Sequence, residues 1–333
     1  MLEKTILVTG ASGAVGPCVV QALHQAGYKI RTFSIDTPSR SIFPQDIEIV
    51  TGDITDYGAV KSAMQGVDAV VHMAALLHIV NPSPDLHDKY ERINVGGTEK
   101  VVEAAMKANV CRVVLFSTIA VYGQSHGQAL EEQSPTNPDT YYAKTKLAAE
   151  KIVLNTRDDH GKPLGTVLRL GAIYGERVKG NYEKLLQALA KGWFIPIGNG
   201  NNRRTLVYDK DVSQAAVLAV SHSLAAGNVY NVSDGQFHTM NEIIFAMCNA
   251  LGKTVPRFSL PSVLVRKIAG IVEDGSRMLG IRSPIGRSSI DKYTEDIAVE
   301  SKRIQSQLGF VPKYDLISGW QQAVEYMRKM GDL

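Results

Sequence analysis

The sequence predicts an α/β protein built on a doubly wound parallel sheet. Short β-rich runs alternate with helical patterns through its first half, as expected when crossover helices join parallel strands. The strand candidates are almost continuously apolar, which is typical of strands buried on both faces. Their sequences are TILV, KIRTFSI, IEIV, DAVVHM, RVVLFS and TVLRL.

Helix candidates fill the gaps between these strands. Residues 14–26 stop at Gly27, and two longer candidates have the sequences NVGGTEKVVEAAMKAN and YYAKTKLAAEKIVLNT. The pattern becomes irregular after about residue 175. We therefore expect a sheet domain over residues 1–175, joined by strands and a helix from about 205–232, and a smaller C-terminal α/β lobe over 176–333.

The composition is ordinary for a soluble globular enzyme, with 44% hydrophobic and 21% charged residues. A net charge of +3 over 333 residues argues against a nucleic-acid partner. The three cysteines are too widely spaced for a disulfide framework or a metal site. With no export signal and no apolar stretch of roughly 18 residues, we expect a cytoplasmic protein without a metal or a membrane span.

A glycine-rich turn lies directly after the first predicted strand. Residues 9–16 have the sequence TGASGAVG, in which three glycines stand three residues apart before a helix. Such a turn lets backbone N–H groups at the positive end of the helix bind a pyrophosphate. The turn predicts a Rossmann-type dinucleotide site formed by Gly10, Ala11, Ser12, Gly13, Ala14, Val15 and Gly16.

The spacing of these glycines and several later motifs resemble the extended short-chain dehydrogenase/reductase superfamily. Within it, the resemblance is to the NAD-dependent epimerase/dehydratase family, and especially to nucleotide-sugar 4-epimerases. It covers residues 5 to about 250, and it weakens toward the C-terminus. The motifs are TGDITD, HMAAL, NVGGT, FSTIAVYG, YYAKTKLAAE and RLGAIYG.

The resemblance implies roles for individual residues around the cofactor. Asp53 and Ile54 would contact the adenine, and Ala74 and Ala75 would pass under the cofactor. The resemblance also adds three residues: Asn94 and Ser117 on the cofactor side, and Leu76 on the substrate side.

Tyr142 and Lys146 are the candidate catalytic pair. Their i, i+4 spacing places them on one face of a helix. A neighbouring ammonium favours the phenolate, so we expect Lys146 to lower the pKa of Tyr142 by about 1–3 units, into the range of a general base. In the family that the chain resembles, Thr118 would bind the substrate oxygen that alternates between alcohol and ketone. Tyr57 and Lys61 have the same spacing and are interpreted as a surface pair.

The second strand leaves the identity of the dinucleotide open. The epimerases tend to carry an acid where this chain has Ser34, and Asp36 follows two residues later. An acid here accepts the ribose hydroxyls and repels a 2′-phosphate. Asp36 therefore favours NAD, whereas Arg40 and the serines beside it would suit NADP.

The substrate side is predicted from two segments. GNGNNRRTLVYDKDV resembles the stretch in which an arginine, here Arg204, clamps a substrate diphosphate. Asn181 would bind the same group or the sugar. A basic segment that UDP-galactose 4-epimerases use for the same diphosphate is absent, and Arg282 or Arg287 are its candidate replacements. The basic, apolar helix around 264–272 is expected to pack on one side rather than to touch a membrane.

These features together predict a nucleotide-sugar 4-epimerase that retains NAD and acts on a UDP-hexose or UDP-N-acetylhexosamine. The resemblance implies a homodimer through the helices near 90–108 and 141–156. One alternative is an NAD(P)H-dependent reductase of a 4-keto nucleotide sugar or lipid-linked sugar, or of a steroid- or flavonoid-type ketone. Another alternative is a non-catalytic dinucleotide sensor, which would not need Tyr142 and Lys146.

Overall fold

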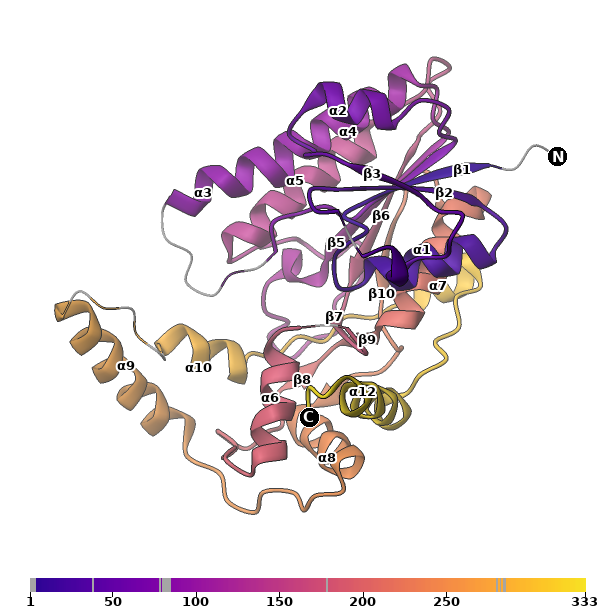
Figure 1. Ribbon diagram of the computed structural model, residues 1–333. Coiled ribbons are helices and arrows are strands. Elements are labelled where there is room, and N and C mark those ends of the chain that lie inside the picture. The colour runs from indigo at the N-terminus through magenta and orange to yellow at the C-terminus, as the bar shows by residue number, and fades with distance from the viewer. Residues whose placement is uncertain are drawn as a thin grey trace.

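A single seven-stranded sheet forms the centre of the computed structural model, which describes residues 4–37, 39–77, 79, 85–177, 179–279, 281, 283 and 286–333. The strand order is β10-β6-β5-β4-β1-β2-β3, and every pairing is parallel. The predicted doubly wound α/β class is therefore confirmed (Figure 1). The strands are β1 (Thr5–Thr9), β2 (Lys29–Ser34), β3 (Glu48–Thr51), β4 (Ala69–His72), β5 (Arg112–Thr118), β6 (Gly165–Leu170) and β10 (Val229–Val232).

Helices cover both faces of this sheet. One face carries α1 (Gly16–Gln25) and α7 (Asp209–Ser221), which pack against each other. The other face carries α2 (Tyr57–Ala63), α4 (Gly97–Lys107) and α5 (Tyr141–Asn155). Because neighbouring residues of a strand point to opposite faces, a strand covered on both sides is apolar throughout.

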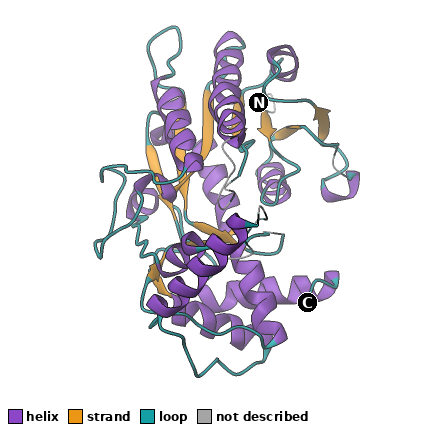
Figure 2. Ribbon diagram, turned by 90° about the vertical axis from the view of Figure 1, so that its left-hand side faces the viewer, coloured by secondary structure: helices purple, strands orange, loops and turns teal. Residues whose placement is uncertain are grey.

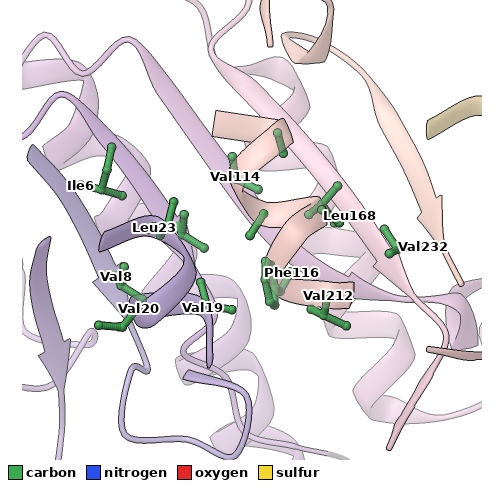
Figure 3. Packing of buried hydrophobic residues seen from close by; sticks show 14 of the residues in the cluster. Ile6, Val8, Val19, Val20, Leu23, Val114, Phe116, Leu168, Val212 and Val232 are labelled. Carbon is green, nitrogen blue, oxygen red and sulfur yellow. The ribbon is translucent and has the colours of Figure 1, made fainter. Parts of the chain in front are cut away.

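The side chains of β1 alternate between the hydrophobic cores on the two faces of the sheet. Ile6 and Val8 pack with α1 and α7, as Figure 3 shows, whereas Leu7 packs with α2 and α4 on the other face. Phe116 and Leu168 extend the first half across β5 and β6. The continuous apolar runs in the sequence therefore arise from burial on two sides.

The C-terminal region is mostly helical and lies beyond the carboxyl ends of the strands (Figure 2). Its core gathers around Tyr174, Tyr208 and Trp320. Two short sheets, β7 (Ala172–Tyr174) with β9 (Leu206–Tyr208) and β8 (Arg203–Arg204) with β11 (His238–Thr239), connect it to the main sheet. The helices of this region are α6 (Asn181–Lys191), α8 (Met240–Leu251), α9 (Ser262–Met278), α10 (Arg287–Thr294) and α12 (Leu316–Met330). A further helix, α11 (Lys302–Leu308), packs against β10 and belongs to the core of the main sheet.

Shorter helical segments complete the chain. They are α3 (Asp85–Tyr90), a π-helical stretch (Glu91–Gly96), and 3₁₀ turns at Arg40–Ile42, Ile119–Tyr122 and Ser223–Ala225. In the described part of the chain, no helix combines the length and the apolar character needed to cross a membrane.

The helix predicted around 264–272 is α9, and it packs on one side as expected, but not by its apolar side. It projects from the body of the molecule and packs against α10 (Figure 1). The narrow side formed by Ala269, Gly270 and Ser276 is buried. Leu264 and Ile271 lie on the opposite, exposed side, so the apolar face of this helix is not the face that packs.

We predict that Gly10→Ala destabilises the protein more than Gly27→Ala does. Both glycines have a positive φ (71° and 85°). An alanine in that backbone conformation lowers the free energy of unfolding by about 1 kcal/mol. At Gly10 a Cβ would also lie 2.7 Å from the backbone of Ala74, whereas at Gly27 it would meet nothing within 4 Å. Overpacking adds about 1–3 kcal/mol. Urea unfolding of the two variants measures the difference, and equal losses would contradict this reading.

Candidate active site

A cavity of about 640 Å³ opens at the carboxyl ends of the central strands. It lies between β4, β1 and β2, where the strand order reverses, and this is the usual ligand site of such sheets. Its volume is in the range of cofactor pockets. The cavity is lined by most of the residues predicted to hold the cofactor, namely Gly10, Ser12, Gly13, Ala14, Val15, Gly16, Asp53, Ile54, Ala74, Ala75 and Ser117, and also by Leu76.

The glycine-rich turn is shaped by its own packing. A Cβ on Gly16 would lie 2.0 Å from the carbonyl oxygen of Ala11, and one on Gly10 would overlap the loop after β4. Side chains are thus excluded at these two positions by the protein's own backbone. Ala11 is fully buried behind the turn and is not part of the cavity wall.

The N-terminus of α1 suits a pyrophosphate. Val15 precedes the helix and makes no side-chain cap, and no acidic residue lies in the first turn. Within this turn the Gly16 and Val19 N–H groups bond the carbonyls of Gly13 and Val15, and Pro17 has no N–H. The positive end of the helix dipole, beside the cavity, is therefore what favours an anion here. The residues present fit a dinucleotide at this place.

The residues at the end of β2 divide between the cavity and solvent. Ser34 is buried, lines the cavity and accepts a hydrogen bond from the Ser12 N–H at 3.1 Å. Asp36, the predicted ribose ligand, is exposed and does not line the cavity. Asp53 lines it, and its carboxylate also accepts the Thr55 N–H at 2.8 Å.

Thr118, Tyr142 and Lys146 line one wall of this cavity. Thr118 ends β5, and its Oγ1 accepts the Ala120 N–H at 3.2 Å. The side chain of Thr140 caps α5 by accepting the Ala143 N–H at 3.2 Å. That cap starts the helix where Tyr142 falls in its first turn, and Lys146 follows one turn later on the same face.

The electrostatics of this pair differ from the expectation. Burial raises the pKa of Tyr142 to about 12, and the neighbouring Tyr90 adds to the rise. Burial also lowers the pKa of Lys146 to about 8, against the opposing effect of Glu150. The expected lowering of the Tyr142 pKa by Lys146 is therefore wrong for this state, because desolvation of the phenolate dominates the shift.

A buried network behind the catalytic wall was not predicted. Glu150 and Arg169 form an ion pair with an N–O distance of 2.7 Å, and both side chains are almost fully buried. The Ser117 hydroxyl donates a short hydrogen bond to Glu150, so it faces this network although Ser117 lines the cavity. Glu150 follows Lys146 by four residues, just as Lys146 follows Tyr142. Continuing this helical spacing by one more turn could have predicted Glu150 on the same face of the helix.

Asn94 lies outside the cavity wall. Its side chain is buried and bonds both the N–H and the carbonyl of Leu76, at 2.7 and 3.1 Å. It also donates to the Thr145 hydroxyl of α5 at 3.1 Å. Asn94 therefore holds the loop after β4 against the helix that carries the catalytic pair.

A second cavity of about 700 Å³ meets the first at Thr118, Gly171 and Ala172, which line both. It extends between α6 and α10, and its wall includes the predicted substrate residues Asn181 and Arg204. Most of the wall is apolar, with Ile119, Tyr182, Leu185, Phe194, Met240, Tyr293 and Ile297. This arrangement places Thr118 between a cofactor-sized and a substrate-sized space.

The arginines predicted to bind substrate form hydrogen bonds and ion pairs with other groups of the protein. Arg204 donates to the carbonyls of Lys292 and Tyr293 and lies 3.5 Å from the buried carboxylate of Glu295. Arg287 pairs with two acids of α9 and lines neither cavity. Arg282 lies outside the described residues.

Lys184 was not predicted, although it lines the second cavity from α6. It is exposed and forms no ion pair with a described residue. Its position one helical turn after Asn181 could have predicted it on the same face, toward the substrate. Of the described residues, no group of three His, Cys, Asp or Glu side chains is placed to hold a metal ion.

The fold and this double cavity define a dinucleotide-dependent enzyme of the extended short-chain dehydrogenase/reductase type. The chain belongs to the NAD dependent epimerase/dehydratase family, whose sequence pattern matches residues 6–233. The family assignment expected from the motifs is confirmed, and the family's cofactor is NAD.

The proteins to which this chain is similar are named for different substrates. The chain is 28% identical over 98% of its length to an N-acetyl-alpha-D-glucosaminyl-diphospho-ditrans,octacis-undecaprenol 4-epimerase of Escherichia coli O157:H7, covering 96% of that protein. It is 29% identical over 78% of its length to a 3 beta-hydroxysteroid dehydrogenase/Delta 5-->4-isomerase of Mycobacterium tuberculosis, covering 73% of it. The solved structure of MoeE5 in complex with UDP-glucose and NAD superposes with a TM-score of 0.76 at 24% identity, covering 98% of this chain and 99% of that one.

We predict that Tyr142 stays protonated in the cofactor-free protein at every pH below about 10, because burial favours the neutral phenol and raises its pKa to about 12. The measurement is the phenolate absorbance of the wild-type protein minus that of Tyr142→Phe across a pH titration. A difference signal that develops between about pH 7 and 9 would show that Lys146 dominates instead.

Proposed function

We propose that this protein is an NAD-dependent 4-epimerase of a diphosphate-linked sugar, a UDP-hexose or UDP-N-acetylhexosamine. The observation that carries the proposal is that Thr118, at which the two cavities meet, shares the wall of the first cavity with Tyr142 and Lys146. A 4-epimerase needs its acid–base groups at this junction, because the sugar C4 must face both the cofactor and a proton acceptor. The 4-epimerase relative named above supports the same reaction class.

When bound, NAD supplies the acceptance and return of the hydride at C4. Tyr142 would take the proton of the C4 hydroxyl at its phenolic oxygen and later return it. Lys146 would hold the cofactor ribose and favour the phenolate by its charge. Thr118 would donate its hydroxyl hydrogen to the C4 oxygen, since its oxygen already accepts the Ala120 N–H. Rotation of the ketone between the two hydride transfers would invert the configuration.

Burial explains how one tyrosine would serve in both directions. The raised pKa of Tyr142 makes its neutral form the stable one in the free protein. A nearby positive charge shifts that balance toward the phenolate, so the base would form when substrate and cofactor are in place. The proton would then pass back as the sugar is reduced.

The diphosphate would lie along α6. Lys184 and Asn181 line this part of the second cavity, and Lys184 has a charge that no described acid neutralises. An ammonium beside phosphate oxygens forms charge-assisted hydrogen bonds. Arg204 would contribute less, because Glu295 already faces it.

A reductase of a hydrophobic ketone is the second candidate. The apolar wall of the second cavity and the ion pair of Arg204 with Glu295 favour a substrate with little negative charge. The steroid dehydrogenase relative is consistent with this alternative. Both candidates use the same catalytic wall, so the substrate lobe decides between them.

We predict that Tyr142→Phe lowers kcat by a factor of about 10²–10⁴, the usual contribution of a positioned acid–base group, while NAD stays bound. The assay incubates the protein with UDP-glucose and with UDP-N-acetylglucosamine, then measures sugar configuration and reduced nicotinamide. An inverted sugar with no net change in cofactor supports the epimerase. Net oxidation of added NADPH by a keto substrate, with no inversion, would instead establish the reductase.

Tyr141→Phe is the matched control for this variant. Tyr141 is the preceding residue of α5, does not line either cavity and stacks on His87 at 3.6 Å between ring centroids. A phenylalanine retains that stacking, so Tyr141→Phe should leave kcat unchanged. Equal losses in the two variants would point to a damaged helix and not to a missing base.

We predict that Lys184→Ala raises the KM for a UDP-sugar by about tenfold, the worth of one charge-assisted hydrogen bond, with little change in kcat. Lys191→Ala is its control, because Lys191 lies on the same helix and outside the cavity wall. A ketone without charge should bind equally well to both variants. An unchanged KM for the UDP-sugar would remove Lys184 from the diphosphate site.

A further inference from the structure

The surface around α9 exposes an unusual number of large apolar side chains. Leu264, Ile268, Ile271 and Met278 are spaced four, three and seven residues apart, which puts them on one face of the helix. Their exposed fractions are 50%, 53%, 73% and 89%. No described residue covers this face, since the helix packs by its other side against α10.

Two neighbouring loops, one of which leads into α9, also expose large aromatic side chains. Trp193 and Phe258 are exposed by 80% and 85%. The loops that carry them lie side by side, because Leu260 and Pro196 are joined by a backbone hydrogen bond of 2.9 Å. We call Trp193, Phe258, Leu264, Ile268, Ile271 and Met278 the apolar surface.

The charges around the apolar surface are almost all positive. Residues 253–279 contain five basic and two acidic residues. Both acids, Glu273 and Asp274, are paired with Arg287 of α10, at 3.2 and 2.6 Å. Lys267 and Arg277 form no ion pair with a described residue, so they leave the helix with an uncompensated positive charge.

Arg257 and Lys253 add further exposed positive charge on the loop that leads into α9. Lys191 stands over the Trp193 ring, 5.7 Å from its centroid. An aliphatic stripe, exposed aromatic rings and surrounding basic residues are together typical of a helix that lies in the interface of an anionic bilayer. Each lysine or arginine near such a surface adds to the attraction.

We propose that the apolar surface docks this protein on the surface of an anionic membrane, with α9 lying in the plane of the headgroups. The charges favour this occupant over a second copy of the chain. A two-fold interface would set the same basic residues against each other. Anionic headgroups complement them, and the acyl region accepts the apolar face.

Docking in this orientation would bring the second cavity close to the membrane. Lys292 and Tyr293 of α10 line that cavity, while Asp291 of the same helix pairs with Arg266 of α9 at 2.7 Å. Phe194 also lines the cavity, between two exposed neighbours, Trp193 and Ile195. A single helix and one loop thus separate the cavity from the apolar surface.

Tryptophan fluorescence provides a direct test. The chain has two tryptophans, of which Trp193 is exposed and Trp320 is 2% exposed. Vesicles of phosphatidylglycerol mixed with phosphatidylethanolamine should shift the emission to the blue, since Trp193 leaves water. The shift should be absent in Trp193→Phe. No shift with these vesicles would overturn the proposal.

Two variants separate the apolar and the electrostatic contributions in a vesicle sedimentation assay. Ile268→Glu with Ile271→Glu should weaken binding at least about tenfold, because both apolar anchors become charged. Lys267→Glu with Arg277→Glu should reduce binding to the level seen with phosphatidylcholine vesicles. Leu224→Glu with Val311→Glu is the matched control, since both positions are similarly exposed elsewhere, and it should bind as the wild type does.

The mass of the protein in solution tests the alternative that a second copy of the chain covers the apolar surface. Light scattering should give the same mass for the wild type and for Ile268→Glu with Ile271→Glu. A dimer that this variant dissociates, together with no binding to vesicles, would assign the apolar surface to a second copy. Unchanged vesicle binding by the variant would also refute the docking geometry.

Discussion

The active site depends on one buried ion pair, between Glu150 of α5 and Arg169 of β6. Each charge has lost its water and relies on the other, so removal of either partner would cost about 3–5 kcal/mol. Arg169 also donates to the Tyr122 hydroxyl at 2.9 Å, and Tyr122 donates to Asn231 of β10 at 2.8 Å. The Ser117 hydroxyl of β5 completes the group. Three strands and α5 are therefore fixed relative to one another, and the catalytic side chains of α5 face the end of β5 as a consequence.

The same burial sets the chemistry of the catalytic pair. Tyr142 and Lys146 both shift toward their neutral forms, because a charge is expensive in a cavity with apolar walls. Helical spacing shows that the two side chains share a face, but it carries no information on how much water surrounds them. Proximity alone therefore suggested a lowered tyrosine pKa, and the enclosed geometry reverses the sign. A site of this kind suits a proton that moves only when other charges have entered.

The parts of the structure that follow from short-range patterns were predictable. The apolar strands, the glycine-rich turn and the wall of Thr118, Tyr142 and Lys146 each follow from spacing within a few residues or from motif order. Contacts between distant segments were not. Arg204 meets Glu295 only because α10 returns to the substrate lobe, and no local pattern links these positions. The face of α9 that packs was also hidden, since amphipathic periodicity identifies an apolar face without saying whether the protein covers it.

The two lobes consequently differ in how they hold together. The sheet domain is stabilised by apolar contacts on both faces of its strands, which fix its shape for any member of the family. The outer part of the substrate lobe is also held by two ion pairs at α10, an exposed pair of Arg266 with Asp291 and a mostly buried pair of Arg204 with the adjoining Glu295. Exposed ion pairs contribute little stability. Part of the wall of the substrate cavity comes from α10 and the adjoining Glu295, and specificity can change there while the catalytic wall stays the same.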